Sequence, residues 1–307
     1  MEEKRQRMLL IVNPVSGKQL AAQYMLRMIN CFDKGGYAVT ACCTKKTENA
    51  YEIVKKRGAE FDLIVCCGGD GTLKETAGGV MELEKDIPIG YLPMGSTNDF
   101  AHSLGIPTDV MAAAELVVHG EPHPVDIGEF AGEHFIYIAG FGNFTALSYE
   151  VNQSVKNKIG RNAYYLRAAK DFFHMKTYHA RVVADGETFE DDYFYGAVSS
   201  SYSIGGMPVM YNLGVEFDDG LHELVLVRMF HTVGEALGLV RDMLKKDVSQ
   251  NPLLTIRHVK DVQMEFPEPT AFTLDGEFGG THRQVHANVM RHAVRIITPK
   301  KENDEVD

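Results

Sequence analysis

Short uninterrupted runs of hydrophobic residues mark the first part of the chain. Residues 8–12, 63–67 and 87–92 are almost entirely apolar, and residues 37–44 form a further strand-like segment. Runs without polar alternation are typical of strands covered on both faces, as in a parallel sheet. Helix-length segments separate them, at 20–32, 48–57 and 72–83, with a shorter helix near residue 100. This alternation predicts a doubly wound parallel sheet whose ligands gather at the carboxyl ends of the strands.

The pattern changes after Asp126, where helix-length segments become scarce. Strand-like runs occupy residues 134–139, 178–184, 193–199, 223–229, 254–256, 262–265 and 271–274. Helical spacing is limited to residues 160–175 and 233–246. The pattern of the second part therefore predicts an antiparallel domain. A length of 307 residues is enough for two domains.

Composition narrows the class of protein. No apolar run approaches the roughly 20 residues of a membrane-spanning helix, and the run at 8–12 is too short for a signal peptide, so we expect a cytoplasmic protein. The five cysteines, Cys31, Cys42, Cys43, Cys66 and Cys67, lack metal-ligand spacing. Because strand neighbours point to opposite faces, the pairs 42/43 and 66/67 are interpreted as small buried residues rather than disulfides or metal ligands.

The formal net charge of −11 argues against a nucleic-acid partner and against general attraction to anionic membranes. One stretch departs from this balance, because seven basic residues lie against two acidic ones between Glu150 and Arg181, interleaved with tyrosine and phenylalanine. A solvated helix face and a membrane-facing or phosphate-facing patch are the two interpretations of this stretch.

One buried run ends in a turn with unusual chemistry. Residues 63–67 lead directly into Gly68-Gly69-Asp70-Gly71-Thr72. Glycines permit positive φ and close backbone approach, so amide groups can line up on an anion. Asp70 would repel a bound phosphate unless a divalent cation lay between them, so the turn indicates nucleotide plus metal. A plain tight turn is the alternative.

Two further strands end in polar turns. The first leads into Asn13-Pro14-Val15-Ser16-Gly17-Lys18, which suits phosphate at a helix N-terminus but lacks P-loop spacing, and which also fits a capped helix start. The strand at 87–92 leads into Gly95-Ser96-Thr97-Asn98-Asp99-Phe100-Ala101, which could act only as a helix cap. Asp99 nevertheless gives a second carboxylate at the edge that holds Asp70, which favours a metal or acid–base site.

These three blocks, in this order, resemble the diacylglycerol kinase catalytic domain of soluble bacterial lipid kinases and of sphingosine and ceramide kinases. The glycine turn is also similar to that of NAD kinases and, more distantly, phosphofructokinases. The resemblance covers almost the whole chain. It implies a nucleotide-binding α/β domain at 1–128, to which 290–307 return through a strand at 293–298, and a β-sandwich lipid-substrate domain at 129–289.

The resemblance also implies site residues in the first domain. Asp70 and Asp99 would hold the catalytic Mg²⁺, directly or through water, and Lys18 would neutralise phosphate charge. The residues expected to contact ATP are Asn13, Pro14, Val15, Ser16, Gly17, Lys18, Thr44, Gly68, Gly69, Asp70, Gly71, Thr72, Leu73, Lys74, Glu75, Ser96 and Asn98. Lys74 and Ser96 depart from the family pattern, which usually has Asn and Thr there.

Two turns of the second domain complete the expected site. In the turn at 216–221 the family places a structural Mg²⁺, here with the carboxylate of Asp219 and the backbone carbonyls of Glu216 and Leu221, although Asp-Gly is also an ordinary hairpin signal. In Thr273-Leu274-Asp275-Gly276-Glu277, the resemblance makes Glu277 the base that takes the proton of the acceptor hydroxyl. Asp275 would orient Glu277 or join the metal network, and a simple hairpin turn is the alternative.

The resulting hypothesis is an ATP-dependent lipid kinase. It would phosphorylate the hydroxyl of diacylglycerol or a similar lipid, bound between the domains at the membrane surface, to give a product of the phosphatidic acid type. The alternatives are an NAD kinase-like phosphotransferase and a non-catalytic nucleotide-binding regulator. The sequence leaves open the identity of the lipid, the effect of Lys74 and the oligomeric state, for which we consider a homodimer.

Overall fold

The computed structural model describes residues 5–17, 20–143, 175–200, 215–244, 248 and 250–300. The chain divides into two compact units. Unit 1 comprises Met1–Ile127, Phe217–Asp219 and Met290–Asp307, and unit 2 comprises Gly128–Glu216 and Gly220–Val289. The inclusion of 217–219 in unit 1 was not indicated by the sequence pattern.

Unit 1 contains a parallel sheet in the order β13-β4-β3-β1-β2. Its strands are β1 (Gln6–Val12), β2 (Tyr37–Cys43), β3 (Leu63–Gly68), β4 (Ile89–Pro93) and the last part of β13 (Glu277–Thr298). Its helices are α1 (Leu20–Lys34), α2 (Ala50–Arg57), the short 3₁₀ helix η2 (Gly58–Glu60), α3 (Asp70–Met81), α4 (Asp99–Ser103) and α5 (Val110–His119).

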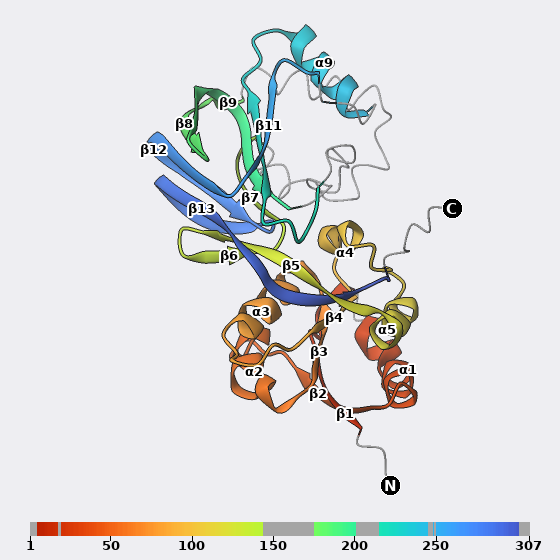
Figure 1. Cartoon of the computed structure of the whole chain (residues 1–307). Coiled ribbons are helices and arrows are strands. Elements are labelled where there is room, and N and C mark those ends of the chain that lie inside the picture. Colours follow the sequence, from red (N-terminus) through yellow and green to blue (C-terminus); the bar gives the residue numbers. More distant parts are fainter. Residues whose placement is uncertain are drawn as a thin grey trace, which may run out of the picture. The chain divides into compact units, whose positions relative to one another are not determined.

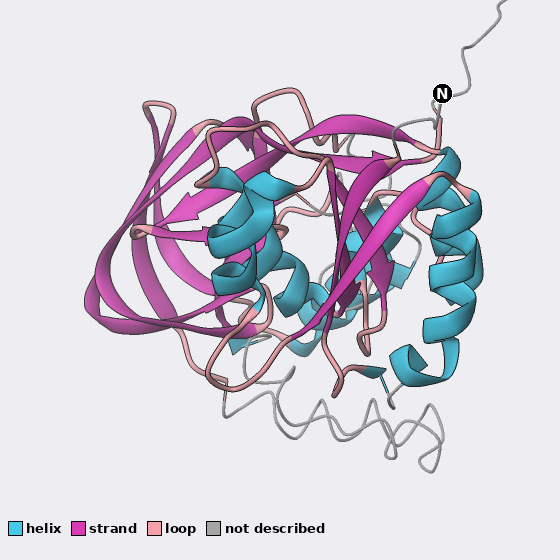
Figure 2. Ribbon diagram, turned by 90° about the horizontal axis from the view of Figure 1, so that it is seen from below, coloured by secondary structure: helices cyan, strands magenta, loops and turns pink. Residues whose placement is uncertain are grey.

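Helices cover both faces of this sheet, with α1 and α5 on one side and α2 and α3 on the other (Figures 1 and 2). Alternate residues of β1 and β3, such as Leu10 and Val65, belong to the hydrophobic cluster on the α1 and α5 side. The residues between them, such as Ile11 and Ile64, are also fully buried. Two buried faces explain why these strands appear in the sequence as continuous apolar runs.

Unit 2 is built mainly of antiparallel strands, in the order β11-β10-β9-β7-β12-β13, with β8 paired to β12 and β9. The strands are β7 (Ile138–Gly142), β8 (Tyr178–Ala184), β9 (Glu187–Ser199), β10 (His222–Arg228), β11 (Leu254–Val259) and β12 (Asp261–Leu274). The short β6 (Glu133–Phe135) pairs with β5 (Glu121–Phe130), and α9 spans Val233–Leu244. Aromatic residues, including Phe141, Phe266 and Phe272, pack together in its core.

Several sequence expectations about individual segments require correction. Cys42 is only half-buried and Cys43 is exposed, because β2 is the edge strand of its sheet; Cys66 and Cys67 are buried as expected. The strand expected at 293–298 extends back to Glu277, because it forms a hairpin with β12. The predicted run 134–139 is divided between β6 and β7.

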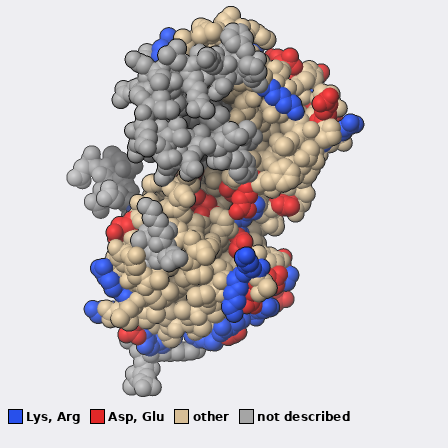
Figure 3. Space-filling view, turned by 180° about the vertical axis from the view of Figure 1, so that it is seen from behind, with Lys and Arg blue, Asp and Glu red and all other residues tan. Residues whose placement is uncertain are grey.

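The expected basic helix at 160–175 lies outside the described residues. Two members of the basic stretch are described: Arg181 forms exposed ion pairs with Glu190 and Glu265, and Lys176 lies 5.0 Å from the ring of Tyr178. On the face shown in Figure 3, Lys and Arg side chains lie among Asp and Glu side chains rather than in a separate area. Within the described part of the chain, no helix is both long and apolar enough to cross a membrane.

Candidate phosphate and metal site of unit 1

Three turns at the carboxyl ends of β1, β3 and β4 meet in unit 1. The side-chain amide of Asn13 donates a 3.0 Å hydrogen bond to Oγ1 of Thr72, which joins the first turn to the second. Gly69 and Gly95 join the second turn to the third, because a Cβ built on Gly69 would lie 3.1 Å from the Cα of Gly95. A side chain at either glycine would prevent this close approach of the two backbones.

The first turn also contacts the end of β4. Gly17 has a φ of +48°, and a Cβ at this position would lie 2.1 Å from the carbonyl oxygen of Met94. Thr44 lies beside the same turn, since its amide donates a 2.9 Å hydrogen bond to the carbonyl of Val12. Lys18, the cation expected to neutralise phosphate, lies outside the described residues.

Helix α3 begins at Asp70, directly after the glycines of the second turn. The first amide groups of a helix have no partner within the helix and carry its positive dipole end, so this point can receive an anion. The side chains of Thr72 and Leu73 are both buried, so Leu73 could offer a nucleotide only its backbone. Lys74 and Glu75 follow on the helix and are half-buried.

Asp70 and Asp99 form the acidic centre of this region, and both are buried. The backbone amides of Asp99 and Phe100 donate hydrogen bonds to the Asp70 carboxylate, and the Tyr91 hydroxyl lies 3.4 Å from it. Burial raises the pKa of Asp70, and the negative charge of Asp99 raises it further. Two buried carboxylates within electrostatic reach of one another fit a divalent cation, which would offset their repulsion.

A cation at these two residues would need other ligands. Among the described residues, no group of three or more histidine, cysteine or acidic side chains is arranged to hold a metal ion. Mg²⁺ commonly binds one or two protein carboxylates and completes its shell with water and substrate phosphates. The donor set therefore fits a metal that arrives with a nucleotide better than a permanent structural metal.

The third turn is shaped by Asn98, which adopts the left-handed conformation with φ of 52°. Its side-chain oxygen accepts a 2.7 Å hydrogen bond from the amide of Gly95, and its side-chain nitrogen donates to the carbonyl of the same residue. Ser96 is exposed at the tip of this turn. Glu75 also has a local role, since it accepts a hydrogen bond from the amide of Ala50 at the start of α2.

Two residues around this region carried no recognisable sequence signal. Tyr91 is a phenol within the apolar run of β4, and nothing in that run distinguishes it from a core tyrosine. Asp126 is 1% exposed, accepts a 2.7 Å hydrogen bond from the amide of His292, and donates its own amide to the carbonyl of Phe217.

The segment 217–219 of the expected metal turn is tied to other parts of unit 1. Phe217 packs edge-on against Phe100, with ring centroids 6.2 Å apart. The ring of His292 forms a 2.9 Å hydrogen bond with the carbonyl of Asp218. Asp219 belongs to unit 1, whereas Glu216 and Leu221 belong to unit 2.

The other expected catalytic residues lie in unit 2. Asp275 and Gly276 form the two-residue turn between β12 and β13, and both have positive φ. The Asp275 carboxylate is buried and accepts hydrogen bonds from the amides of Ile136, Tyr137 and Ile138, at 2.9 to 3.2 Å. Glu277 is exposed at the start of β13. The hairpin interpretation of this segment is thus correct, and it leaves the carboxylate of Glu277 accessible.

Comparison with known proteins agrees with the motifs. Residues 7–130 match the model of the diacylglycerol kinase catalytic domain. Diacylglycerol kinase from Bacillus subtilis (strain 168) is 29% identical over 300 residues, covering 97% of this chain and 98% of that protein. Diacylglycerol kinase from Staphylococcus carnosus (strain TM300) is 29% identical over 299 residues, covering 96% of each chain.

Solved structures share the fold. A crystal structure of a diacylglycerol kinase from Bacillus anthracis str. Sterne has a TM-score of 0.76 and 21% identity, covering 97% of this chain and 99% of the other. A second crystal structure from the same strain has a TM-score of 0.80 and 24% identity, with the same coverage. The motif blocks, the match over residues 7–130 and the nearly full-length relatives agree in showing that this chain is similar to diacylglycerol kinases.

Proposed function

We propose that this protein is an ATP-dependent lipid kinase that phosphorylates the hydroxyl of diacylglycerol or a similar lipid to give a product of the phosphatidic acid type. The observation that carries the proposal is the meeting of three glycine-containing turns around Asp70 and Asp99 in unit 1. The family relationship supplies the lipid class, since the relatives named above are diacylglycerol kinases.

The turns of unit 1 would hold the triphosphate. Backbone amides near Gly17, Gly69 and Gly71 would donate to phosphate oxygens, and the start of α3 would add its dipole. Asp70 and Asp99 would bind Mg²⁺ together with the phosphates, and the metal would neutralise charge on the transferring group. The described residues would contribute positioning and charge compensation, which carry most of the catalysis of phosphoryl transfer.

Glu277 is the proposed base. A lipid hydroxyl has a high pKa, so a carboxylate that accepts its proton as the new bond forms would speed the transfer. Asp275 is assigned a positioning role, because its carboxylate fixes residues 136–138 and thereby the turn that presents Glu277. The turn at 216–221 is proposed to bind a structural Mg²⁺ through Asp219 and the carbonyls of Glu216 and Leu221.

The acceptor can be tested with a panel of alcohols and labelled ATP. Vesicles or micelles containing diacylglycerol, phosphatidylglycerol or a sphingoid base would be compared with soluble NAD, and the labelled product identified by chromatography. We expect label in a lipid, with diacylglycerol as the best acceptor. Transfer to NAD alone would replace the lipid assignment with the NAD kinase-like alternative, and no transfer to any acceptor would support a non-catalytic regulator.

The role of Glu277 can be tested by Glu277→Gln. We expect turnover to fall by about 10²-fold or more while ATP binding measured by calorimetry stays within a factor of about two. Glu268→Gln is the matched control, because Glu268 is an exposed glutamate on the preceding strand β12. Wild-type turnover in the Glu277 variant would remove this residue from the proposed role.

A further inference from the structure

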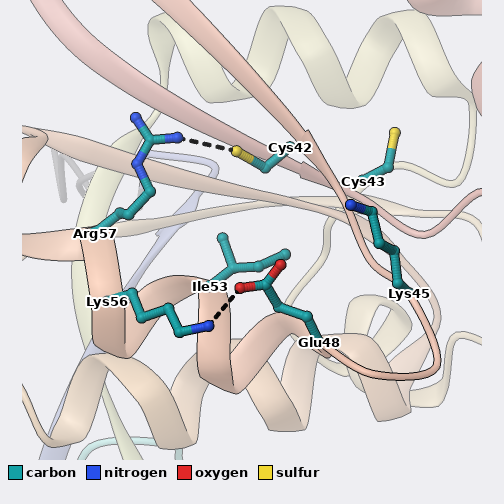
Figure 4. A pocket seen from close by; sticks show the side chains of 7 residues that line it. All are labelled: Cys42, Cys43, Lys45, Glu48, Ile53, Lys56 and Arg57. Carbon is teal, nitrogen blue, oxygen red and sulfur yellow. Dashed lines mark hydrogen bonds and ion pairs between the residues drawn. The ribbon is translucent and has the colours of Figure 1, made fainter.

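A pocket of about 220 Å³ lies in unit 1, beside the edge strand β2 and helix α2 (Figure 4). Its size suits a fragment rather than a drug-sized ligand, for which pockets usually exceed about 300 Å³. Three cationic side chains, one carboxylate, two thiols and one aliphatic side chain line it: Lys45, Lys56, Arg57, Glu48, Cys42, Cys43 and Ile53. The charge of the lining is therefore positive.

One of the two thiols is in contact with a cation. The guanidinium Nη1 of Arg57 donates a hydrogen bond to Sγ of Cys42 across 3.4 Å, and Figure 4 shows the two side chains pointing toward one another. The pocket's carboxylate, Glu48, is paired with Lys56 at 2.7 Å. Cys42 is half-buried and lines the pocket, so a small reagent that enters the pocket would lie beside this residue.

The other cysteines lack this combination. Burial raises the pKa of Cys31 to about 11 and that of Cys67 to about 12, and it also raises the pKa of Cys66. Buried thiols of this kind are poor nucleophiles, because the thiolate is the reactive form. Cys43 is exposed, but its sulfur points away from Arg57 in Figure 4. Cys42 therefore differs from Cys43, which lines the same pocket, in that its sulfur accepts a hydrogen bond from a cationic side chain.

We propose that Cys42 is a reversible modification site for small disulfides that carry negative charge. Cations around the pocket would attract the reagent. Arg57 would stabilise the negative charge, which moves from the Cys42 sulfur to the departing sulfur of the disulfide during the exchange. In the reaction, the Cys42 thiol loses its proton to solvent, and the thiolate attacks one sulfur of the disulfide. The disulfide bond breaks, a new bond joins Cys42 to one half, and the other half leaves as a thiolate. The disulfide is the oxidant.

The test compares an anionic with a neutral disulfide. Cys43→Ser protein, which keeps Cys42, and Cys42→Ser protein, which keeps Cys43, would be treated with dithiobis(nitrobenzoate) and with uncharged dithiodipyridine. The ratio of the anionic to the neutral rate constant should be about tenfold or more higher for Cys42 than for Cys43, and should fall as salt is added. Peptide mass spectrometry would confirm which cysteine carries the adduct.

Charge variants distinguish the effect of the cations that line the pocket from the effect of other charges on the surface. In the Cys43→Ser background, Arg57→Gln should reduce the preference of Cys42 for the anionic reagent. Lys55→Gln should leave it unchanged, because Lys55 is on the same helix but pairs with Glu82 and does not line the pocket. Thermal unfolding checks that each variant folds, and Arg57→Lys retains the charge if Arg57→Gln does not fold. Equal rate ratios for the two cysteines, or an unlabelled Cys42, would overturn the proposal, which is independent of the proposed kinase activity.

Discussion

Asn13 and Thr72 are 59 residues apart in the sequence, yet the side-chain amide of Asn13 donates a 3.0 Å hydrogen bond to the hydroxyl oxygen of Thr72. The bond joins the turn after β1 to the start of α3. It therefore fixes the positions of two of the three expected phosphate-binding segments relative to one another. Thr72 is buried, which limits competition from water.

Replacing this hydroxyl should therefore weaken nucleotide binding. Thr72→Val keeps the shape of the side chain but leaves the Asn13 amide without its acceptor, so we expect the KM for ATP to rise about 2- to 12-fold, the equivalent of a hydrogen bond of about 0.5–1.5 kcal/mol. Thr72→Ser retains the hydroxyl and should lie close to wild type. Similar KM values for the valine and serine variants would show that the bond does not organise the nucleotide site.

Gly17 offers a test of the close approach between the first turn and β4. In Gly17→Ala, the added methyl group would collide with the carbonyl of Met94 and oppose the positive φ. We expect a loss of about 1–3 kcal/mol in the free energy of unfolding and a raised KM for ATP. Gly36→Ala is the control, because Gly36 also has positive φ but has open space around it. If both variants changed KM equally, the turn geometry would not be responsible.

Removal of the Asp70 charge should affect the binding of Mg²⁺ with ATP but not the stability of the metal-free protein. Burial and Asp99 both disfavour the charged form of Asp70, so Asp70→Asn should not lower the melting temperature of the metal-free protein. The same variant should lose the stabilisation that Mg²⁺ with ATP gives to wild type, and its kcat should fall by about 10²-fold or more. Asp86→Asn, which removes an exposed carboxylate, should retain both properties. Undiminished stabilisation by Mg²⁺ and ATP in Asp70→Asn would exclude Asp70 as a ligand.

Asp275 should affect stability and activity together. Asp275→Ala removes the acceptor of three backbone hydrogen bonds and places a less tolerant residue at positive φ, so we expect a loss of about 1–3 kcal/mol in unfolding free energy, together with reduced kcat. Asp275→Asn keeps the acceptor oxygen for the amides of Tyr137 and Ile138 and tolerates the left-handed conformation, so it should recover part of both. A kcat as low in the asparagine variant as in the alanine variant, with stability restored, would instead indicate that the charge itself takes part in catalysis.

The sequence predicted the strands and turns of the first domain well, because local signals define them. Short apolar runs such as 63–67, each followed by glycines, are typical of strands buried on both faces, and the close contact of the turns requires those glycines. The sequence pattern did not predict α5, whose residues 110–119 are apolar at most positions and lack the polar face of an amphipathic helix.

Features that depend on neighbouring strands could not be read from the sequence. The exposure of Cys42 and Cys43 follows from the position of β2 at the sheet edge, which strand order alone decides. Similarly, the length of β13 follows from its pairing with β12, since its own sequence contains glycines, histidines and charges rather than a strand pattern. The hydrogen bonds of Asp275 join residues 137 to 139 positions apart, beyond the range of any local motif.

The place of β13 beside β4 has a consequence for how the chain is made. Ile296 pairs with Ile89, so the sheet of unit 1 is completed by a strand that leaves the ribosome after more than half of the chain has followed β4. Until then, the apolar edge of β4 has no strand to cover it, and exposed edges of this kind promote association with other chains. A nascent chain stalled before residue 290 would be a natural client for chaperones.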